Sequence, residues 1–561
     1  MPWTIWRYTL VELFRTVFMA TAILVSVIAF AAAIKPLAEG ALSPVGAVKF
    51  MALAVPPMLA YALPFSAGFG AALVYHRMAQ DNEAIAAHSG GISHRALLVP
   101  AACTALLLGG TLSSLNEWVI PRFLHSMERM ISLDVAQLMI RQIERGQAAE
   151  LGGVMIHAER IDRIEPPPEL GARQMYLMHR VTAVQLNDED VADSDVTVAK
   201  AWLWTTPDPD DPDKTICRVQ MEDGVYAPSS GGLRQVETGR WRAIRIPDAF
   251  EEDPKYFTFA ELRALYDDPD RIDFVDVRRV RLAEAIARTR IRERLTRELA
   301  DTRRLTLLGD GGQRYEITAD SLAPAPGGAM RLVREGEPVR VRRYEVGAGG
   351  ELTPSTDYAD LAWLRPEERD RAEGASLWDE AASSGPSLRF ALQLVDVRTE
   401  RPGREPVERT RRDFRSLRLA GDPLEQLAQQ TSATLLDEAH AMEAEGEGGD
   451  LVPSVAADLS YMIAKLRREI ISKQQERMAM SVASAVMLML GAITAMRLRD
   501  SLPLVVYLRS FFPALAMILL ISSGQSYTHS SSVPGGVALL WSGVVAGGII
   551  AAYEFVRLAR H

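Results

Sequence analysis

Cysteine is almost missing from this sequence, since Cys103 and Cys217 are the only two among 561 residues. Two cysteines are too few for a disulfide framework, and neither lies beside the histidine or cysteine cluster that a zinc site needs. The sequence also contains no GxxxxGKS/T, HExxH or GxSxG pattern. We therefore expect no catalytic residues, no metal and no cofactor in this chain; any energy that it uses must be supplied by another protein.

Charge is scarce at both ends of the chain. Residues 1–120 and 478–561 together carry 18 charged side chains, whereas residues 121–477 carry 116 charged side chains with a net charge of −14. Lipid excludes charged side chains from long apolar segments. The distribution predicts two membrane segments around one large, acidic and water-exposed centre.

The apolar ends contain long runs without charge. They are Thr16–Ile34, Phe50–Tyr75, Ala96–Asn116, Met478–Met496 and Ser510–Tyr553, the last of which is divided by the polar break Ser526–Gly536. A helix of about 20 residues spans the hydrocarbon core of a bilayer. We therefore expect a bundle of six transmembrane helices, three before the centre and three after it.

The first run could instead be a signal peptide, because the small residues Ala31–Ala33 follow it. A signal core usually has only 7–15 apolar residues, and Trp3, Trp6 and Tyr8 suit a membrane interface. A transmembrane helix is favoured. With six spans both termini lie on one side and the centre on the other, but lysine and arginine are too evenly divided to decide which side is which.

The centre begins with short strand-like runs between turn signals. They are Val154–Ile161, Gln174–Asn187, Val196–Thr206, Thr215–Ala227 and Arg240–Pro247. Apolar and polar residues alternate in several of them, as expected for strands with one buried face. We predict a β-rich, jelly-roll-like domain over residues 121–247.

The next segment, 248–454, mixes both patterns. Phe257–Arg304 has helical periodicity, and strand-like runs follow around Tyr315–Ile317, Met330–Tyr344 and Leu388–Val397. Val455–Arg477 reads as a helix that continues into the fourth span. The predicted domains are therefore 1–120, 121–247, 248–454 and 455–561.

The link between the second and third spans has a distinctive pattern. Residues 75–95 read YHRMAQDNEAIAAHSGGISHR, which predicts a short amphipathic helix near residues 80–93, with an Asp or Asn cap and a stop at Gly90 and Gly91. A plain connecting loop is the alternative. This link resembles the LptF/LptG (YjgP/YjgQ) family of lipopolysaccharide-transport permeases, which has a similar D-N-E-x-x-A-x-x-x-x-G-x-S pattern.

Other segments are similar to the same family, in the same order along the chain. They are Asn116–Pro121 after the third span, Val198–Ala201 with Glu222–Gly224 in the centre, and Glu476, Arg477 and Ala479 before the fourth span. The resemblance covers about residues 1–247 and 455–561. Residues 248–454 exceed what the family normally carries, and we treat them as an insertion of unknown role.

The resemblance implies a multi-pass protein of the bacterial inner membrane with a cytoplasmic N-terminus and a large periplasmic domain. It implies a permease that extracts lipopolysaccharide, or a related glycolipid, and passes it to a periplasmic bridge of LptC- or LptA-like β-domain proteins. The implied partners in the membrane are a second LptF/LptG-type permease chain and an LptB-type ATPase dimer, which uses the ATP. A membrane-anchored periplasmic structural or sensory protein is the alternative, but such an anchor does not need the short helix between spans two and three.

Two groups of residues are candidates for function. We expect Asp81, Asn82 and Glu83 to couple the chain to the ATPase; the alternative is a capped helix with solvated carboxylates. We expect Lys35, Lys49 and Arg122, at the outer helix ends, to bind substrate phosphates, because a lysine ammonium pairs well with phosphate. The alternative is that the lysines only anchor their helices by extending to the membrane interface.

Overall fold

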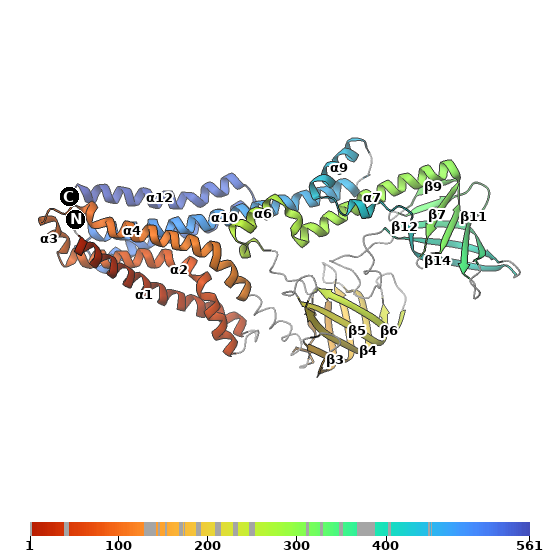
Figure 1. The fold of residues 1–561 in the computed structure, drawn as a ribbon, viewed down its shortest axis with the longest axis horizontal. Helices are drawn as coiled ribbons and strands as arrows, with labels where there is room; N and C mark the ends of the chain where they lie inside the picture. The colour runs from red at the N-terminus through yellow and green to blue at the C-terminus, as the bar shows by residue number, and fades with distance from the viewer. Residues whose placement is uncertain are drawn as a thin grey trace.

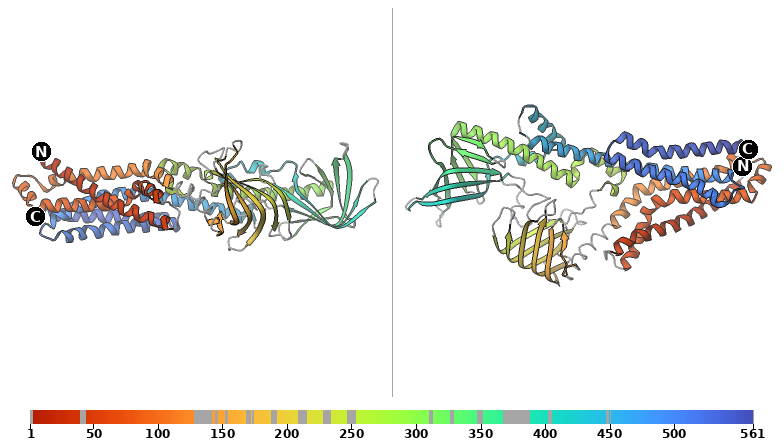
Figure 2. Two further views of the ribbon diagram at one scale, coloured as in Figure 1. Left: turned by 90° about the horizontal axis from the view of Figure 1, so that it is seen from below. Right: turned by 180° about the vertical axis from the view of Figure 1, so that it is seen from behind.

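The structure is a computed structural model of the full chain. It describes residues 3–38, 44–127, 142–143, 146–151, 154–167, 172, 174–186, 192–207, 215–227, 234–245, 253–309, 313–325, 329–346, 352–366, 388–401, 405–446, 449 and 451–560. A helical bundle forms one end of the molecule, and two β-sheets lie beyond its other end (Figures 1 and 2). Both termini lie together at the outermost tip of the bundle (Figure 1).

Six helices within the described residues are long and apolar enough to cross a membrane. They comprise α1 (Trp3–Ala38), α2 (Pro44–Gln80), α4 (His94–Ser114) with its π-helical continuation η1 (Leu115–Val119), α10 (Leu451–Arg497), α11 (Pro503–Ser530) and α12 (Val533–Ala559). Three precede the β-strands in sequence and three follow them. The prediction of six apolar spans is confirmed.

The bundle contains many close helix contacts at small residues. Gly68 on α2 faces Gly491 on α10, and Gly70 on α2 faces Val17 on α1. Because lipid supplies no hydrophobic force between helices, such contacts depend on close packing of small residues. The helix α2 continues through Pro56, Pro57 and Pro64, which membrane helices tolerate where neighbouring helices shield the freed carbonyls.

The first sheet has six antiparallel strands in sequential order. They are β1 (Ala149–Leu151), β2 (Val154–Ile164), β3 (Gln174–Leu186), β4 (Ala192–Pro207), β5 (Thr215–Ala227) and β6 (Arg234–Arg245). Its core contains Met178, Val181, Val196 and Val198. All five predicted strands are present, although β6 begins six residues before the predicted start at Arg240. The description of this first sheet as a jelly roll stays a prediction.

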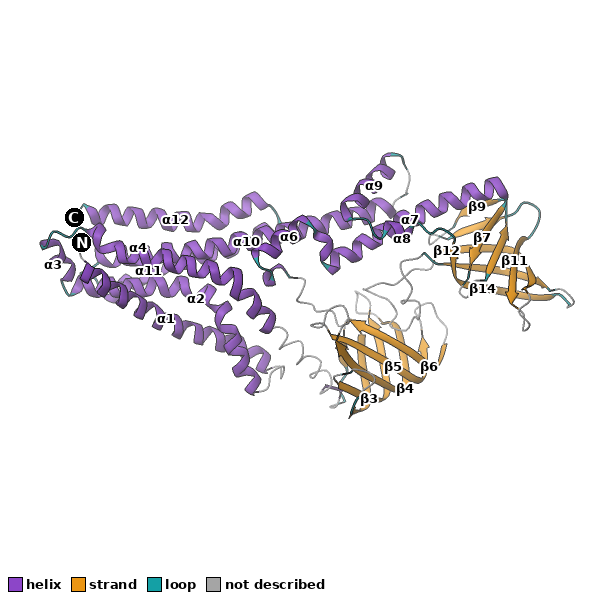
Figure 3. Cartoon of the chain, viewed as in Figure 1, coloured by secondary structure: helices purple, strands orange, loops and turns teal. Residues whose placement is uncertain are grey.

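The segment 248–454 contains helices and a second sheet (Figure 3). The helices are η3 (Pro254–Tyr256), α6 (Phe259–Asp267), η4 (Pro269–Arg271), α7 (Asp273–Thr302), α8 (Leu424–Leu427) and α9 (Ser432–Ala444). The strands are β7 (Arg304–Leu308), β8 (Arg314–Thr318), β9 (Ser321–Pro324), β10 (Met330–Val333), β11 (Val339–Val346), β12 (Leu352–Pro366), β13 (Phe390–Glu400) and β14 (Val407–Leu419). The domain boundaries themselves stay predictions.

The second sheet closes on itself. The strand β11 pairs with β8 on one side and with β12 on the other, so that β7, β8, β11, β12, β13 and β14 form a ring. The ring closes between β7 and β14 through two residue pairs, Arg418 with Leu308 and Leu419 with Leu307, so β14 is paired with β7 only at its end. The remaining strands, β9 and β10, extend the sheet beside the second half of β12.

A buried charge cluster lies in this barrel. The carboxylate of Asp357, which is fully buried, accepts hydrogen bonds from Arg343 at 3.1 Å, Arg412 at 3.0 Å and Thr399 at 2.6 Å. Both guanidinium groups also lie about 5 Å from the ring of Phe414, within cation–π range. A buried carboxylate requires such partners because it has lost its hydration.

The bundle and the part of the chain that carries the second sheet share one helix, α10. The first part of α10 packs in the core of α7 and the second sheet through residues such as Leu459, Leu466 and Ile470. Its second part packs in the membrane bundle through Leu488 and Ile493. The predicted helix 455–477 therefore continues into the fourth span without a break, as the sequence indicated.

Candidate functional site

A short helix, α3 (Glu83–Ser89), lies at the tip of the bundle beside both termini (Figure 1). It is held by its own buried face, because Ala84 and Ala87 pack into the core formed by α1, α2, α4 and α10. The side chains of Asp81, Asn82 and Glu83 are exposed, and so is Ile85. The predicted helix is confirmed, and the residues proposed for coupling are accessible at its start.

The start of α3 differs from the prediction. Asn82 stands at the N-cap, but its side chain makes no capping hydrogen bond, and its backbone is left-handed at φ 57°. Asparagine tolerates this conformation better than most residues. Asn82 therefore acts through its backbone, by turning the chain sharply after α2. The predicted stop is present, since Gly90 caps the helix and Gly91 has φ +79°.

Contacts around α3 fix it to its neighbours. The ring of His88 lies 2.6 Å from the carbonyl oxygen of Ile92 and 2.8 Å from the ring nitrogen of His94. On α2, Arg77 forms an ion pair with Glu12 of α1 at 3.1 Å and donates a hydrogen bond to Tyr8 at 3.1 Å. His88 thus joins α3 to the start of α4, and Arg77 joins the end of α2 to α1.

A pocket of about 630 Å³ lies between α3 and the start of α1. It is lined by Thr4, Ile5, Tyr8, Met78, Glu83, Ala86, Ala87, Gly90 and Ile92. Among these residues Glu83 is the only one with a full charge. The surface beside α3 is therefore concave and mostly apolar, with a carboxylate on its wall.

The candidate substrate residues lie at the opposite end of the bundle. Lys35 is in the last turn of α1, and Lys49 is in the second turn of α2. Ala33, Phe50 and Met127 form one small apolar cluster, which brings the ends of these two helices beside the end of the third span. Lys35, Lys49 and Arg122 are all exposed, so each can reach a headgroup outside the bundle.

Sequence reasoning missed a set of contacts near this end of the bundle, which we term the outer junction: Glu117, Arg477 and residues 255–259. The guanidinium of Arg477 donates to the carbonyl oxygens of Phe257 and Lys255, both at 2.7 Å. The carboxylate of Glu117 accepts from the backbone N–H of Phe259 at 3.0 Å. Both side chains belong to segments singled out by resemblance, but their partners are more than 140 residues away in sequence.

The π-helical turn η1 contributes to the same junction. It contains Asn116, which is buried and donates a hydrogen bond to Ser481 of α10 at 3.5 Å. π-Helical turns are rare in proteins, and those that occur often lie at functional sites. Apart from the Asn116–Pro121 motif itself, no pattern in the sequence predicts this turn.

Comparison with known proteins supports the resemblance. The family model described as "Lipopolysaccharide export system permease LptF/LptG" matches residues 6–213. The matched segment contains α1 to α4, η1 and β1 to β4, and with them the motifs at residues 81–93, 116–121 and 198–201. The motifs at Glu222–Gly224 and Glu476–Ala479 lie beyond it. No curated protein matches the chain.

Proposed function

We propose that this chain, of which residues 6–213 match the model of the lipopolysaccharide export permease family LptF/LptG, is the permease subunit of an ATP-driven exporter in the bacterial inner membrane. In this proposal it extracts lipopolysaccharide, or a related glycolipid, and passes it to a periplasmic β-domain bridge. The six spans form a three-plus-three bundle with both termini in the cytoplasm. The first sheet is the jelly-roll-like periplasmic domain.

The observation that carries the proposal is the geometry of α3. It is anchored by Ala84 and Ala87, and it exposes Asp81, Asn82 and Glu83 beside a pocket. A membrane anchor needs no such helix. The proposed partner is an LptB-type ATPase dimer, whose basic groove would receive these side chains, and a second LptF/LptG-type permease chain would supply the other half of the complex.

Copurification tests the coupling role. The variant Glu83→Lys reverses an exposed charge, so we expect at least a fivefold loss of copurified ATPase while the chain still inserts into the membrane. The matched control is Asp500→Lys, which reverses another exposed charge between α10 and α11. Equal copurification of both variants with the ATPase would refute the coupling role of Glu83.

Reporter fusions test the orientation. Gly336 is exposed in the turn between β10 and β11 and has φ +74°, so a fusion there leaves both strands intact. We expect a reporter at Gly336 to report the periplasm and a reporter at the C-terminus to report the cytoplasm. Both reporters on one side would contradict the six-span arrangement.

Removing the charge of the two lysines distinguishes a role in substrate binding from a role in anchoring the helices. Replacing Lys35 and Lys49 together by Gln retains length and polarity but removes both ammonium groups. We expect photocrosslinking of lipopolysaccharide at the neighbouring exposed positions Ile34 and Val48 to fall at least threefold, with Arg122→Gln giving a smaller loss. Unaltered crosslinking in the double variant would eliminate the phosphate role and leave the anchoring role.

In this proposal, transfer of the lipid to LptC- or LptA-like domains follows its binding by the bundle and takes place at the first sheet.

A further inference from the structure

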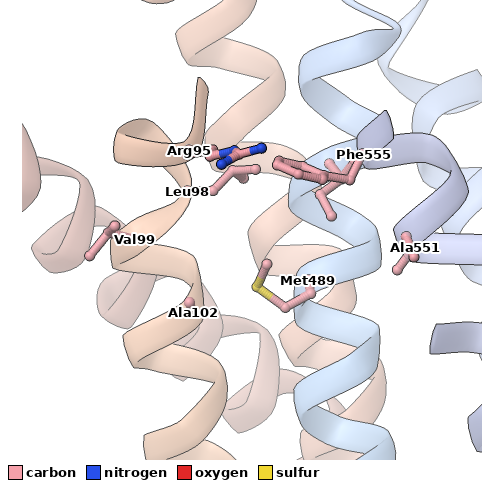
Figure 4. Close-up of a pocket in the computed structure, with 9 residues that line it drawn as sticks. Arg95, Leu98, Val99, Ala102, Met489, Ala551 and Phe555 are labelled. Atoms are coloured by element: carbon pink, nitrogen blue, oxygen red, sulfur yellow. The ribbon is translucent and has the colours of Figure 1, made fainter. Parts of the chain in front are cut away.

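A second pocket opens on the surface of the bundle, between α4, α10 and α12, on a different set of helices from the lysines (Figure 4). Its volume is about 370 Å³, at the lower end of the range for small-molecule sites. It is lined by Arg95, Leu98, Val99, Ala102, Met489, Ile493, Ala551, Ala552 and Phe555. It therefore joins one helix from before the central domain to two helices from after it.

The lining of the pocket suits an amphiphilic ligand, with a charged group at one place and apolar groups elsewhere. Eight of the nine residues are apolar, and the ninth is Arg95. Figure 4 shows the guanidinium of Arg95 extending across the pocket toward Phe555, while Met489 points from α10 toward α4. One cation stands at the side of an otherwise hydrocarbon-lined space.

The position along α4 fixes the depth of this cation. The helix begins at His94, so Arg95 lies in its first turn, where an arginine head reaches the membrane interface. Ala102 is seven residues further on, which at 1.5 Å per residue is about 10 Å deeper in the bilayer. The charge is thus at headgroup level, and the apolar wall continues below it into the acyl-chain region.

Other charges near the pocket do not neutralise Arg95. The carboxylate of Glu554, which precedes Phe555 on α12, is paired with Arg497 of α10. On the same helix Arg557 lies over the ring of Tyr553 at 4.7 Å. Within the described part of the chain Arg95 has no ion pair, and its side chain is exposed. The mouth of the pocket therefore keeps a positive charge.

We propose that this pocket binds one anionic glycerophospholipid, with its phosphate on Arg95 and part of an acyl chain against Val99, Ala102 and Met489. Basic pockets between transmembrane helices are known to select anionic lipid headgroups. The lipid comes from the leaflet nearest α3, which is the cytoplasmic leaflet in the proposed orientation. Bound there, it holds α4 against α12 and so joins the two halves of the bundle.

Photolabelling of the full chain in nanodiscs tests the proposal. The probe is phosphatidylglycerol with a diazirine in its acyl chain, at low abundance in phosphatidylcholine, and adducts are mapped by mass spectrometry. We expect adducts to concentrate on residues 98–102, 489–493 and 551–555. The internal reference is the surface of α1, where Phe18 and Ile23 are 74% and 66% exposed.

Variants separate a site from the surrounding lipid. We expect Arg95→Gln to reduce pocket labelling at least threefold, Arg95→Lys to retain most of it, and Ala102→Trp to abolish it by filling the space. The control Arg499→Gln removes another exposed arginine and should change nothing. An Arg95→Gln chain that elutes as a single species confirms that the loss is not unfolding.

Three results would overturn the proposal. The first is equal labelling of the pocket and the α1 reference, which is the behaviour of the lipid shell alone. The second is equal labelling by a phosphatidylcholine probe, which shows no selection for the anion. The third is absence of labelling because a second permease chain covers the pocket. The assay needs neither ATPase nor lipopolysaccharide, so its failure is distinct from failure of the proposed function.

Discussion

The contact between α2 and α10 at Gly68 and Gly491 leaves no room for a methyl group. A Cβ atom on Gly491 would lie 2.3 Å from the carbonyl oxygen of Gly68, 3.1 Å from its carbonyl carbon and 3.3 Å from the nitrogen of Ala72. All three atoms belong to backbone and cannot rotate away. By contrast, a Cβ atom on Gly548 of α12 would have nothing within 4 Å.

The magnitude follows from this overlap. Ordinary contacts of a Cβ atom begin at 3.4 Å, so Gly491→Ala must move the two helices apart by about 1 Å. Overpacking of this kind costs about 1–3 kcal/mol. Alanine also gains about 0.5–1 kcal/mol over glycine as a helix former, but Gly548→Ala gains the same amount. We therefore expect Gly491→Ala to be less stable than Gly548→Ala by about 1–3 kcal/mol.

Unfolding in mixed micelles measures this difference. The purified full chain is titrated with a denaturing detergent, and helix content is followed by circular dichroism. A second pair on one helix serves as a check, because a Cβ on Gly109 would lie 3.1 Å from the carbonyl of Ser481, whereas one on Gly110 has open space. If Gly491→Ala proved as stable as Gly548→Ala, the backbone contact between α2 and α10 would not limit the packing of the bundle.

Three further substitutions test other contacts. Asp357→Asn leaves the buried Arg343 and the partly buried Arg412 without their carboxylate, so we expect the free energy of unfolding of the barrel to fall by about 3–5 kcal/mol in thermal unfolding. Asp413→Asn, at a partly exposed pair, should change little. Arg477→Met leaves two carbonyls of the outer junction unpaired, and limited proteolysis should cut near residue 255 at least fivefold faster. Glu554→Gln leaves Arg497 without its partner, and the melting temperature of the bundle should fall, with Glu554→Gln and Arg497→Gln together costing less than the sum of both changes.

Hydropathy locates the membrane helices well but not their ends. The first predicted run began at Thr16, whereas α1 begins at Trp3 and passes through Arg7, Glu12 and Arg15. These charged residues lie at the membrane interface, where a helix continues although its composition is no longer apolar. Absence of charge therefore identifies the part of the helix in hydrocarbon and misses the part in water.

The second sheet could be predicted only in part. The short strands β7 and β9 and the long strands β12 and β14 were missed. Among the long strands, β12 contains Asp357 and two prolines, and β14 has five arginines among its 13 residues. Such residues argue against a strand when each is judged alone. In the closed barrel the inward charges of Arg343, Asp357 and Arg412 satisfy one another, and that pairing arises from residues up to 69 positions apart.

The candidate site was predicted to a similar extent. The local pattern around residues 81–93 was enough to find α3, since the turn at Asp81 and Asn82 before it and the stop at Gly90 and Gly91 after it both lie close by in the sequence. The capping mechanism was wrong because the backbone of Asn82 turns left-handed after α2, which depends on how α2 and α3 meet. Likewise the roles of Glu117 and Arg477 could not be predicted, because their partners at residues 255–259 are brought to them by the tertiary fold.

The helix α10 determines how the insertion relates to the membrane bundle. At 47 residues it is about 70 Å long, and it supplies core residues to both parts of the chain. Between the two cores, Arg477 fastens the segment that leads into α6. Because one unbroken helix belongs to both cores, a shift of α10 in the bundle is transmitted to its contacts with α7 and the second sheet. These contacts couple residues 248–454 to the fourth span.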